Sequence, residues 1–405
     1  MPTLEELFTQ VDAQRDEIIA LEQTLVRIPS VNTGFMPTGD ETPVCEYIRD
    51  WLAEDGIESE ILGRTPERGN IIARIEGSNS DAGLMFMSHT DVVPVEEEEK
   101  WRFPPFSATI ADGRIYGRGA SDCKGLLTAQ LYAMRLLIRN GIQLEDSLIF
   151  CSGEKGRLQV EIEVKGVSSH ASVPWQGTNA LYTLQRVLQR IEAYEPERDT
   201  STSLFDHLSV FAIEHKPSAA NVDEIIAEIE PENPRFASMM RALSRMTLTP
   251  TMISGGIKSN SVPETIRLTC DVRTLPHQSD DYLREQLDSI LEGIPNTTYE
   301  IDYMAVPNSS SFDTDLGRSV QRATAAALGI DDIQWVPAIS TGFTDSRFTR
   351  PLGTVTYGFN GSHPDDDPML SRAHGTDESI GISSLISGTK IMLALAIDVL
   401  NGKSD

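Results

Sequence analysis

The sequence has few basic residues. Lysine and arginine together number 34, against 61 aspartates and glutamates, which gives a net charge of −27 at pH 7. Such a surface repels phosphate groups, so the charge argues against nucleic acids and anionic membranes as partners. The acidic balance fits an ordinary soluble surface and also fits adaptation to salt, and the sequence leaves these two explanations open.

Cysteines and long apolar runs are also scarce. The four cysteines, Cys45, Cys123, Cys151 and Cys270, lie far apart and form no CxxC pair. We therefore expect free thiols in a reducing cytoplasm rather than a disulfide framework. No run of 18 or more apolar residues occurs, and residues 1–10 are polar and acidic. We expect neither a membrane span nor a secretory signal, and therefore predict a cytoplasmic protein.

The remaining composition is that of a globular protein with more than one domain. Its 405 residues are 40% hydrophobic, and a chain of this length exceeds one core of ordinary size. Residues 4–28 have the apolar spacing of one amphipathic helix. An apolar run at 84–88 and a helical pattern at 125–140 continue an alternation of strands and helices. This alternation predicts an α/β domain with helical layers on a mainly parallel sheet.

The pattern changes near residue 157. Residues 157–165 alternate apolar and polar side chains, which is typical of a half-exposed strand. Mixed strands and helices continue to residue 304, and from residue 305 the α/β pattern resumes. We therefore predict that residues 1–153 and 305–405 form one α/β domain, with residues 157–304 inserted as a separate α+β domain.

The first candidate metal ligand follows a predicted strand. In the run SHTD at 88–91, His89 comes directly after a buried apolar segment. Because the carboxyl ends of strands form the functional edge of open parallel sheets, His89 is placed to bind a metal. Asp91 is then placed to orient the imidazole by accepting its other N–H. A histidine in this pattern alone is more often a satisfied core residue.

Two further motifs carry candidate ligands. The run GRGASDCKG at 117–125 is a glycine-rich loop before a helix, and the carboxylate of Asp122 is able to bridge two zinc ions. Such a loop can also hold phosphate, but its spacing matches neither standard phosphate motif and an aspartate would repel the anion. The run RAHGTDE at 372–378 contains His374, a candidate ligand for a second metal.

Together the motifs resemble a family of co-catalytic zinc metallopeptidases. The family includes aminoacylase, carboxypeptidase S, acetylornithine deacetylase and succinyl-diaminopimelate desuccinylase. Further similar runs occur in the family's order over nearly the whole chain: WRFPPF at 101–106, SSHASVPWQGTNA at 168–180, GGIKSNSVPE at 255–264 and DVRTLP at 271–276. The resemblance implies a three-layer catalytic domain with an inserted, ferredoxin-like lid that also forms the dimer interface.

The resemblance also implies roles for single residues of the catalytic domain. His89 and His374 would each hold one zinc ion, and Asp122 would bridge the two ions. Cobalt and manganese are alternative metals for such a site. Asp91 would orient His89 by accepting the N–H of its other ring nitrogen. The run GFTDSR at 342–347 resembles the family's loop over the substrate.

In the lid, the resemblance implies residues that contact the substrate. His170 matches the histidine that polarises the substrate carbonyl, often from the neighbouring subunit of a homodimer. Asn260 and Arg273 match lid positions that bind the substrate carboxylate. The substrate implied by these positions is an N-acyl amino acid or a small peptide.

The family pattern breaks after Gly153. The family places an adjacent Glu-Glu pair after the strand at 147–151, with one glutamate as general base and the other as zinc ligand. Here the chain continues as EKGR at 154–157, which resembles the start of the lid, so we infer an internal deletion. Taken alone, two strands separated by SGEKG are typical of a β-hairpin. The resemblance instead predicts that the two strands belong to different domains.

The sequence therefore predicts a zinc-dependent hydrolase that cleaves the amide bond of an N-acyl amino acid or a small peptide with a free carboxylate. Loss of the general base lowers the rate of hydrolysis by roughly 10²–10⁴-fold, so we expect impaired activity. The alternative is a non-catalytic descendant of the fold that binds amino-acid-like ligands or a partner.

Overall fold

The computed structural model describes residues 2–33, 40–63, 65–79, 81–153, 158–211, 213, 215–303, 309–337, 345–359 and 361–401. The contacts divide the chain into two compact units. Unit 1 comprises residues 1–155, 311–333 and 357–405, and unit 2 comprises residues 156–310 and 334–356. The predicted domain borders fall at or beside residues outside the described ranges, so these borders stay predictions.

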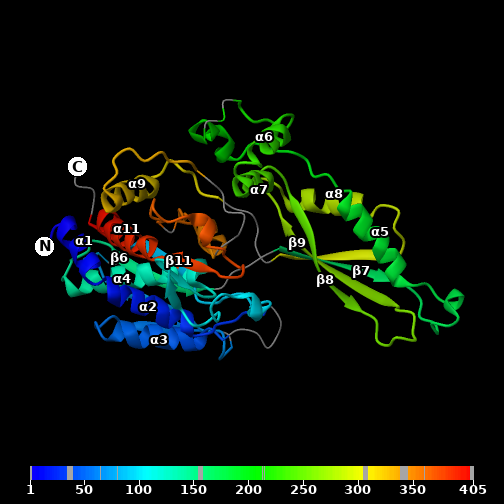
Figure 1. The fold of residues 1–405 in the computed structure, drawn as a ribbon, viewed down its shortest axis with the longest axis horizontal. Coiled ribbons are helices and arrows are strands. Elements are labelled where there is room, and N and C mark those ends of the chain that lie inside the picture. The colour runs from blue at the N-terminus through cyan, green and yellow to red at the C-terminus, as the bar shows by residue number, and fades with distance from the viewer. Residues whose placement is uncertain are drawn as a thin grey trace. The chain divides into compact units, whose positions relative to one another are not determined.

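Unit 1 consists of helices packed on small sheets (Figure 1). Its helices are α1 (Leu4–Ala13), α2 (Arg15–Arg27), α3 (Thr42–Ala53), α4 (Gly125–Arg139), α9 (Asp315–Leu328) and α11 (Ile382–Leu400). The main sheet has the order β1-β2-β6-β3, formed by Ser59–Leu62, Asn70–Ile75, Ser147–Gly153 and Ala82–His89. A smaller sheet has the order β11-β5-β4, formed by Ser379–Gly381, Arg114–Tyr116 and Thr109–Ala111.

The main sheet of unit 1 is mixed, so the prediction of a mainly parallel sheet is wrong. Among its described strands only β3 and β6 run parallel, whereas β2 pairs antiparallel with both β1 and β6. The connection 63–69 between β1 and β2 is too short for a crossover helix, so these strands pair antiparallel. The helix α4 lies between β3 and β6 in the chain and supplies the crossover that a parallel pair requires.

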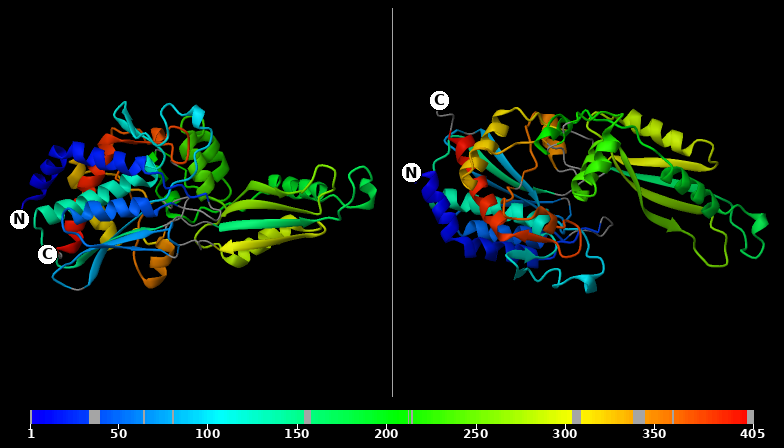
Figure 2. Two further views of the ribbon diagram at one scale, coloured as in Figure 1. Left: turned by 90° about the horizontal axis from the view of Figure 1, so that it is seen from below. Right: turned by 45° about the horizontal axis from the view of Figure 1, so that its top comes forward.

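The N-terminal segment forms two helices, so the prediction of one helix over 4–28 is wrong. The chain leaves helical geometry at Gln14, between α1 and α2. The physical reason is packing, because α1 contacts α11 whereas α2 contacts both α4 and α11. Figure 2 shows α1 (dark blue) beside α11 (red), although the two lie at opposite ends of the sequence.

The helix α11 is a core helix of unit 1. By length and composition it is able to cross a membrane, but 72% of its most apolar window is buried inside the structure. It packs against α4 and α9. Its apolar residues are therefore accounted for by packing within unit 1.

Unit 2 contains a four-stranded antiparallel sheet in the order β10-β7-β9-β8. The strands are β7 (Leu158–Lys165), β8 (Thr247–Gly255), β9 (Thr265–Arg273) and β10 (Thr297–Tyr303), and the helices α5 (Ala180–Glu192) and α8 (Asp280–Leu291) accompany them. The chain order βαββαβ with this strand order is ferredoxin-like. Val160, Ile162 and Val164 are fully buried in the core that the sheet forms with α5 and α8, as the alternation in β7 predicts.

The strands β6 and β7 lie in different sheets, so the hairpin interpretation is wrong. β6 pairs with β2 and β3, whereas β7 pairs with β9 and β10. Turn residues between two apolar runs are a local signal, and both strands have partners elsewhere in the chain. The inferred deletion falls on residues 154–157, outside the described residues, and stays a prediction.

A small lobe separates α5 from β8 in unit 2. It contains α6 (Val222–Ile229) and α7 (Pro234–Leu243), which share a cluster of buried apolar side chains with residues 204–208. Val336 packs against this cluster. This contact helps to explain why residues 334–356, with the short helix α10 (Ser346–Thr349), group with unit 2 although we predicted them within 305–405.

Candidate metal centre

His89 stands at the carboxyl end of a buried strand. In β3, Leu84, Phe86 and Ser88 are buried. The strand runs parallel to β6, and His89 lies opposite Gly153 at the last position of the ladder. The end of β3 therefore brings His89 to the turn Ala120–Lys124 that precedes α4.

Glycines allow this turn to approach its neighbours closely. Gly119 has a φ of 87°, and a Cβ atom at this position would lie 2.4 Å from the side chain of Val92. A Cβ atom on Gly125 would lie 2.2 Å from the side chain of Ile380. Only glycine fits both positions, which explains the glycine-rich motif that places Asp122 at the start of α4.

Asp122 lies between two histidines. Its Oδ1 atom is 2.8 Å from Nε2 of His89, and its Oδ2 atom is 3.1 Å from Nε2 of His374. The side chain of His89 is 13% exposed, that of Asp122 is 23% exposed and that of His374 is 52% exposed. One carboxylate thus faces two imidazoles, with one oxygen toward each, and the group is open to solvent on the His374 side.

The second nitrogen of His89 also has a partner. Nδ1 lies 3.1 Å from Oδ1 of Asp91 and 3.0 Å from the carbonyl oxygen of the same residue. Asp91 is itself buried and accepts a hydrogen bond from Nδ2 of Asn32. A carboxylate behind an imidazole is the usual support of a metal-binding histidine.

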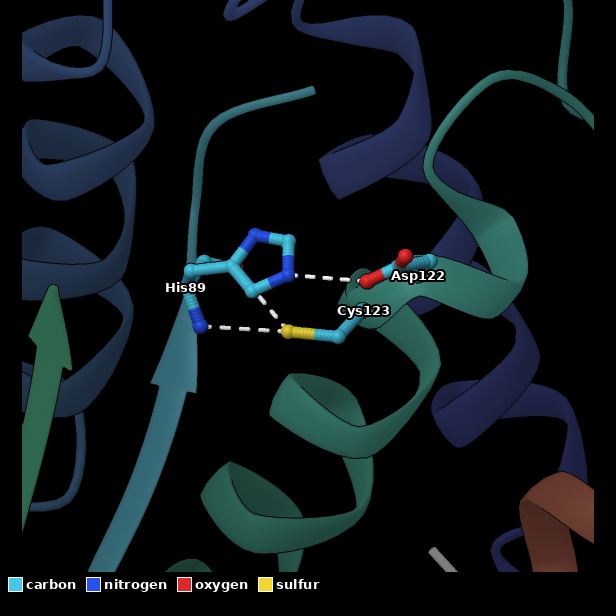
Figure 3. Close-up of side chains that lie close together, drawn as sticks. All are labelled: His89, Asp122 and Cys123. Atoms are coloured by element: carbon cyan, nitrogen blue, oxygen red, sulfur yellow. Dashed lines mark hydrogen bonds and ion pairs between the residues drawn. The ribbon is translucent and has the colours of Figure 1, made fainter. Parts of the chain in front are cut away.

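Figure 3 shows His89 with Asp122 and Cys123 around it. The backbone N–H of His89 donates to Sγ of Cys123, which in turn donates to the carbonyl oxygen of His89. Burial acts to lower the pKa of His89, but the neighbouring Cys123 and hydrogen bonds to Asp122 and Asp91 raise its pKa well above the ordinary value. Acceptors that stabilise a proton at this place would also stabilise a metal cation.

The donor set fits metal ions of the zinc type. Imidazole nitrogen and carboxylate oxygen are common zinc ligands, and the ligand atoms of His89, Asp122 and Cys123 all lie within 4.8 Å of one another. His89 and one oxygen of Asp122 would hold one ion, and the other oxygen and His374 would hold a second. Zinc in proteins usually has four ligands, so water, substrate or further donors would have to complete each ion's shell.

Two of the predicted lid residues lie together in unit 2. The backbone N–H of Ala171 donates to the carbonyl oxygen of Asn260, and His170 forms a β-bridge with Ser261. These contacts continue the ladder of β7 and β9 beyond Lys165. His170 is exposed, and its Nδ1 atom accepts a hydrogen bond from the backbone N–H of Ser172. This bond leaves the ring proton on Nε2, where it is available to a ligand.

Arg273 lies at the opposite end of the same strand. It is the last residue of β9, whereas Asn260 precedes Thr265, the first residue of that strand. A nine-residue strand spans about 27 Å, so Arg273 is far from His170 and Asn260 within one chain. Its guanidinium makes two hydrogen bonds, 2.6 and 2.9 Å long, to the carboxylate of Asp271.

Sequence reasoning missed three residues of this neighbourhood. Cys123, Arg118 and Glu378 lie inside the quoted motifs, but the pattern assigned them no role. Arg118 and Glu378 form a buried ion pair. The sequence signal that could have identified them is one residue of opposite charge in each of the two ligand-bearing motifs. Of the predicted substrate loop, residues 342–344 lie outside the described residues.

Comparison with known proteins gives the relatives of this chain. The family model described as peptidase family M20/M25/M40 matches residues 85–398. A probable succinyl-diaminopimelate desuccinylase of Staphylococcus aureus is 26% identical over 347 residues, which cover 76% of this chain and 82% of that protein.

Solved structures show the same fold. A metallo-carboxypeptidase of the M20 family from Sulfolobus solfataricus has a TM-score of 0.69 at 18% identity, with 94% of this chain and 98% of that chain covered. A dinuclear metal-binding peptidase of the M20 family from Bacillus subtilis has a TM-score of 0.54 at 15% identity, with 96% and 99% covered. These matches confirm the predicted fold class, an α/β domain with an inserted α+β domain.

Proposed function

The chain belongs to peptidase family M20/M25/M40 and is a hydrolase, and we propose that it cleaves the amide bond of an N-acyl amino acid or small peptide with a free carboxylate. The observation that carries this proposal is the carboxylate of Asp122, whose two oxygens face the Nε2 atoms of His89 and His374. This arrangement suits a pair of bridged metal ions. The name of the Staphylococcus aureus relative, a desuccinylase, supports an acylated amino compound as substrate.

We propose zinc as the metal, with cobalt or manganese as alternatives. When bound, a zinc ion lowers the pKa of water to about 7 and polarises a carbonyl group. His89 and His374 would each hold one ion, and Asp122 would hold both. Asp91 would keep the imidazole of His89 in the orientation that metal binding needs, because it occupies the other ring nitrogen. The dinuclear peptidase from Bacillus subtilis supports a site for two ions.

We propose that His170 and Asn260 meet the substrate together. The Nε2–H of His170 would donate to the oxygen that becomes negative during attack on the amide carbonyl. Asn260 lies beside it, since its carbonyl oxygen accepts the N–H of Ala171. Arg273 would bind the free carboxylate, and to do so its guanidinium would exchange one of its bonds to Asp271 for the substrate.

The separation of these lid residues supports a homodimer. Because β9 holds Arg273 about 27 Å from the end that carries Asn260, one small substrate cannot touch both within one chain. A symmetric dimer would bring His170 and Asn260 of one subunit to the substrate bound by the other. The edge strand β8 supports this arrangement, because Met252 and Ile253 are 40% and 58% exposed on a strand whose outer edge has no partner among the described strands.

We propose a cytoplasmic protein that binds a small molecule and neither nucleic acid nor membrane. The four cysteines, all within the described residues, form no disulfide, which supports a reducing compartment. The net charge of −27 supports the absence of phosphate-rich partners.

One observation favours a second candidate function. The strand β6 is followed in the sequence by Glu154 and Lys155 rather than by a Glu-Glu pair. If the general base is missing, the rate falls by roughly 10²–10⁴-fold. The chain would then be an impaired hydrolase or a non-catalytic protein that binds amino-acid-like ligands.

A hydrolysis assay combined with a binding assay distinguishes the hydrolase from the non-catalytic binding protein. The zinc-loaded chain is incubated with N-acetyl amino acids and with their methyl esters as matched controls that lack the carboxylate, and released amine is measured. The proposal predicts slow release from the free acids, none after zinc is removed by a chelator, and less from the esters. Zinc and N-acetyl amino acid binding without release of amine would support the binding protein and contradict the hydrolase.

A further inference from the structure

A buried ion pair joins the two segments that carry Asp122 and His374. Nη1 of Arg118 donates to Oε2 of Glu378 at 2.6 Å, and their side chains are 3% and 1% exposed. Arg118 belongs to the glycine-rich loop before α4, and Glu378 ends the RAHGTDE run. The pair therefore connects two parts of the chain that are distant in sequence and that each supply a candidate ligand.

The other oxygen of Glu378 binds the backbone of the Asp122 segment. Oε1 accepts hydrogen bonds from the backbone N–H of Ser121 at 3.1 Å and from that of Asp122 at 3.0 Å. A carboxylate that accepts two backbone N–H groups fixes the direction of the peptide between them. Glu378 thus sets the position from which the side chain of Asp122 leaves the backbone.

Arg118 binds the backbone of the second ligand. Its Nη2 atom donates to the carbonyl oxygen of His374 at 3.2 Å, and its guanidinium lies 5.1 Å from the ring centre of Trp101. His374 has a φ of 66°, a left-handed conformation that residues other than glycine adopt rarely. Such a conformation persists only where the surroundings hold it, and Arg118 provides one of these contacts.

We propose that Arg118 and Glu378 are positioning residues, which hold Asp122 and His374 at the separation that metal binding requires. The inference rests on the proposed function, because it assumes that these two residues bind metal. Arg118 and Glu378 bind each other, and each also binds the backbone of a candidate ligand: Arg118 that of His374, and Glu378 that of Asp122. A buried ion pair adds little net stability compared with apolar packing, so stability alone does not account for this arrangement.

The same unit offers a matched control. Arg114 and Asp366 also form a buried ion pair, with side chains 5% and 10% exposed. Their other side-chain hydrogen bonds within the described part of the chain go to Ser379 and Ser384, and none of these bonds reaches Asp122 or His374. A variant of this pair therefore reports the cost of breaking a buried ion pair without moving the two candidate ligands.

The test compares zinc affinity in the full chain with the variants Glu378→Gln, Arg118→Lys and Asp366→Asn. Arg118→Lys keeps a cation beside Glu378 but lacks the second donor for His374, so it is the variant most able to fold. Affinity is measured by competition with a chromogenic chelator, and the absorption spectrum of bound Co²⁺ reports ligand geometry. We expect Glu378→Gln and Arg118→Lys to lower zinc affinity by about 10–100-fold and to change the Co²⁺ spectrum, as loss of outer-shell partners does elsewhere. Asp366→Asn should leave both readings at the wild-type values.

The outcomes separate this inference from the function on which it rests. A wild-type chain that binds no zinc would contradict the metal site itself. A wild-type chain that binds zinc, with Arg118→Lys and Glu378→Gln binding it equally well, would overturn only the positioning role. An equal loss of affinity in Asp366→Asn would also overturn it, because the effect would then follow from any broken buried pair. Circular dichroism confirms that each compared variant is folded.

Discussion

The carboxylate of Asp122 and the imidazole of His374 lie 3.1 Å apart, although one residue precedes α4 and the other lies close to the C-terminus. His89 contacts the other oxygen of the same carboxylate at 2.8 Å. Asp122 is therefore the residue that the two histidines share. Its loss should affect metal binding more than the loss of either histidine.

The first prediction concerns metal content. We expect purified protein to carry fewer than two zinc ions per chain, because the described ligands leave each ion's shell incomplete. Asp122→Ala should lose nearly all bound zinc, whereas His89→Ala and His374→Ala should each retain part of it. Elemental analysis measures this, with His277→Ala as control, since His277 is half-exposed in unit 2 and pairs with Asp199. Unchanged zinc in Asp122→Ala and His89→Ala would refute the assignment.

The second prediction concerns pH and Glu22. This residue of α2 is fully buried and accepts a hydrogen bond from Oγ1 of Thr128, and burial raises its pKa from 4.5 to about 8. Between these values the folded protein keeps a proton that the unfolded chain releases, so the free energy of unfolding falls as pH rises. The slope is at most about 1.4 kcal/mol per pH unit.

Glu22→Gln should remove this dependence. Urea unfolding is measured between pH 5 and 7.5. As pH rises, the free energy of unfolding of Glu22→Gln should increase relative to that of the wild type. Asp16→Asn, at a fully exposed position of the same helix, is the control and should follow the wild-type profile. Parallel profiles for Glu22→Gln and the wild type would mean that Glu22 is not protonated in the folded state.

The third prediction concerns the core of unit 2. Leu268 of β9 is fully buried among the side chains of the sheet, α5 and α8, so Leu268→Ala should destabilise the unit by about 2–5 kcal/mol. Leu181→Ala is the matched control, because Leu181 on α5 is 46% exposed and should change stability by no more than about 0.5 kcal/mol. Equal effects of the two substitutions in chemical unfolding would show that β9 is not packed as described.

The fourth prediction concerns the site of action of His170. In the proposed homodimer, the variants His170→Ala and Asp122→Ala should each lose the slow hydrolysis that we expect of the wild-type chain. A mixture of the two chains should regain part of the activity, because one mixed dimer site combines an intact Asp122 with an intact His170. Subunit exchange is confirmed with differently tagged chains. If exchange occurs and no activity returns, His170 acts within its own chain or has no part in hydrolysis.

Much of the fold and site is readable from local sequence signals. The glycines at 119 and 125 mark the turn that places Asp122, and alternation in β7 marks the buried face of the sheet in unit 2. These signals work because backbone freedom and side-chain periodicity depend on neighbouring residues only. The three motifs with His89, Asp122 and His374 could be joined because the family resemblance gave their order.

Features that depend on distant partners could not be predicted in this way. The sheet of β11, β5 and β4 pairs Ser379 with Tyr116, and nothing in either short segment specifies the other. The burial of Glu378 against Arg118 likewise depends on how two remote loops meet. The antiparallel pairing of β1 with β2 follows from their short connection, and that of β2 with β6 joins strands far apart in the chain, so the apolar pattern alone fixes neither.

Anomalous scattering from a zinc-soaked crystal, measured at the zinc absorption edge, tests the central claim most directly. The account predicts zinc peaks beside Asp122, one shared with His89 and one shared with His374, and no such peaks in crystals of Asp122→Asn. Zinc bound elsewhere on the chain, with no peak at Asp122, would contradict it.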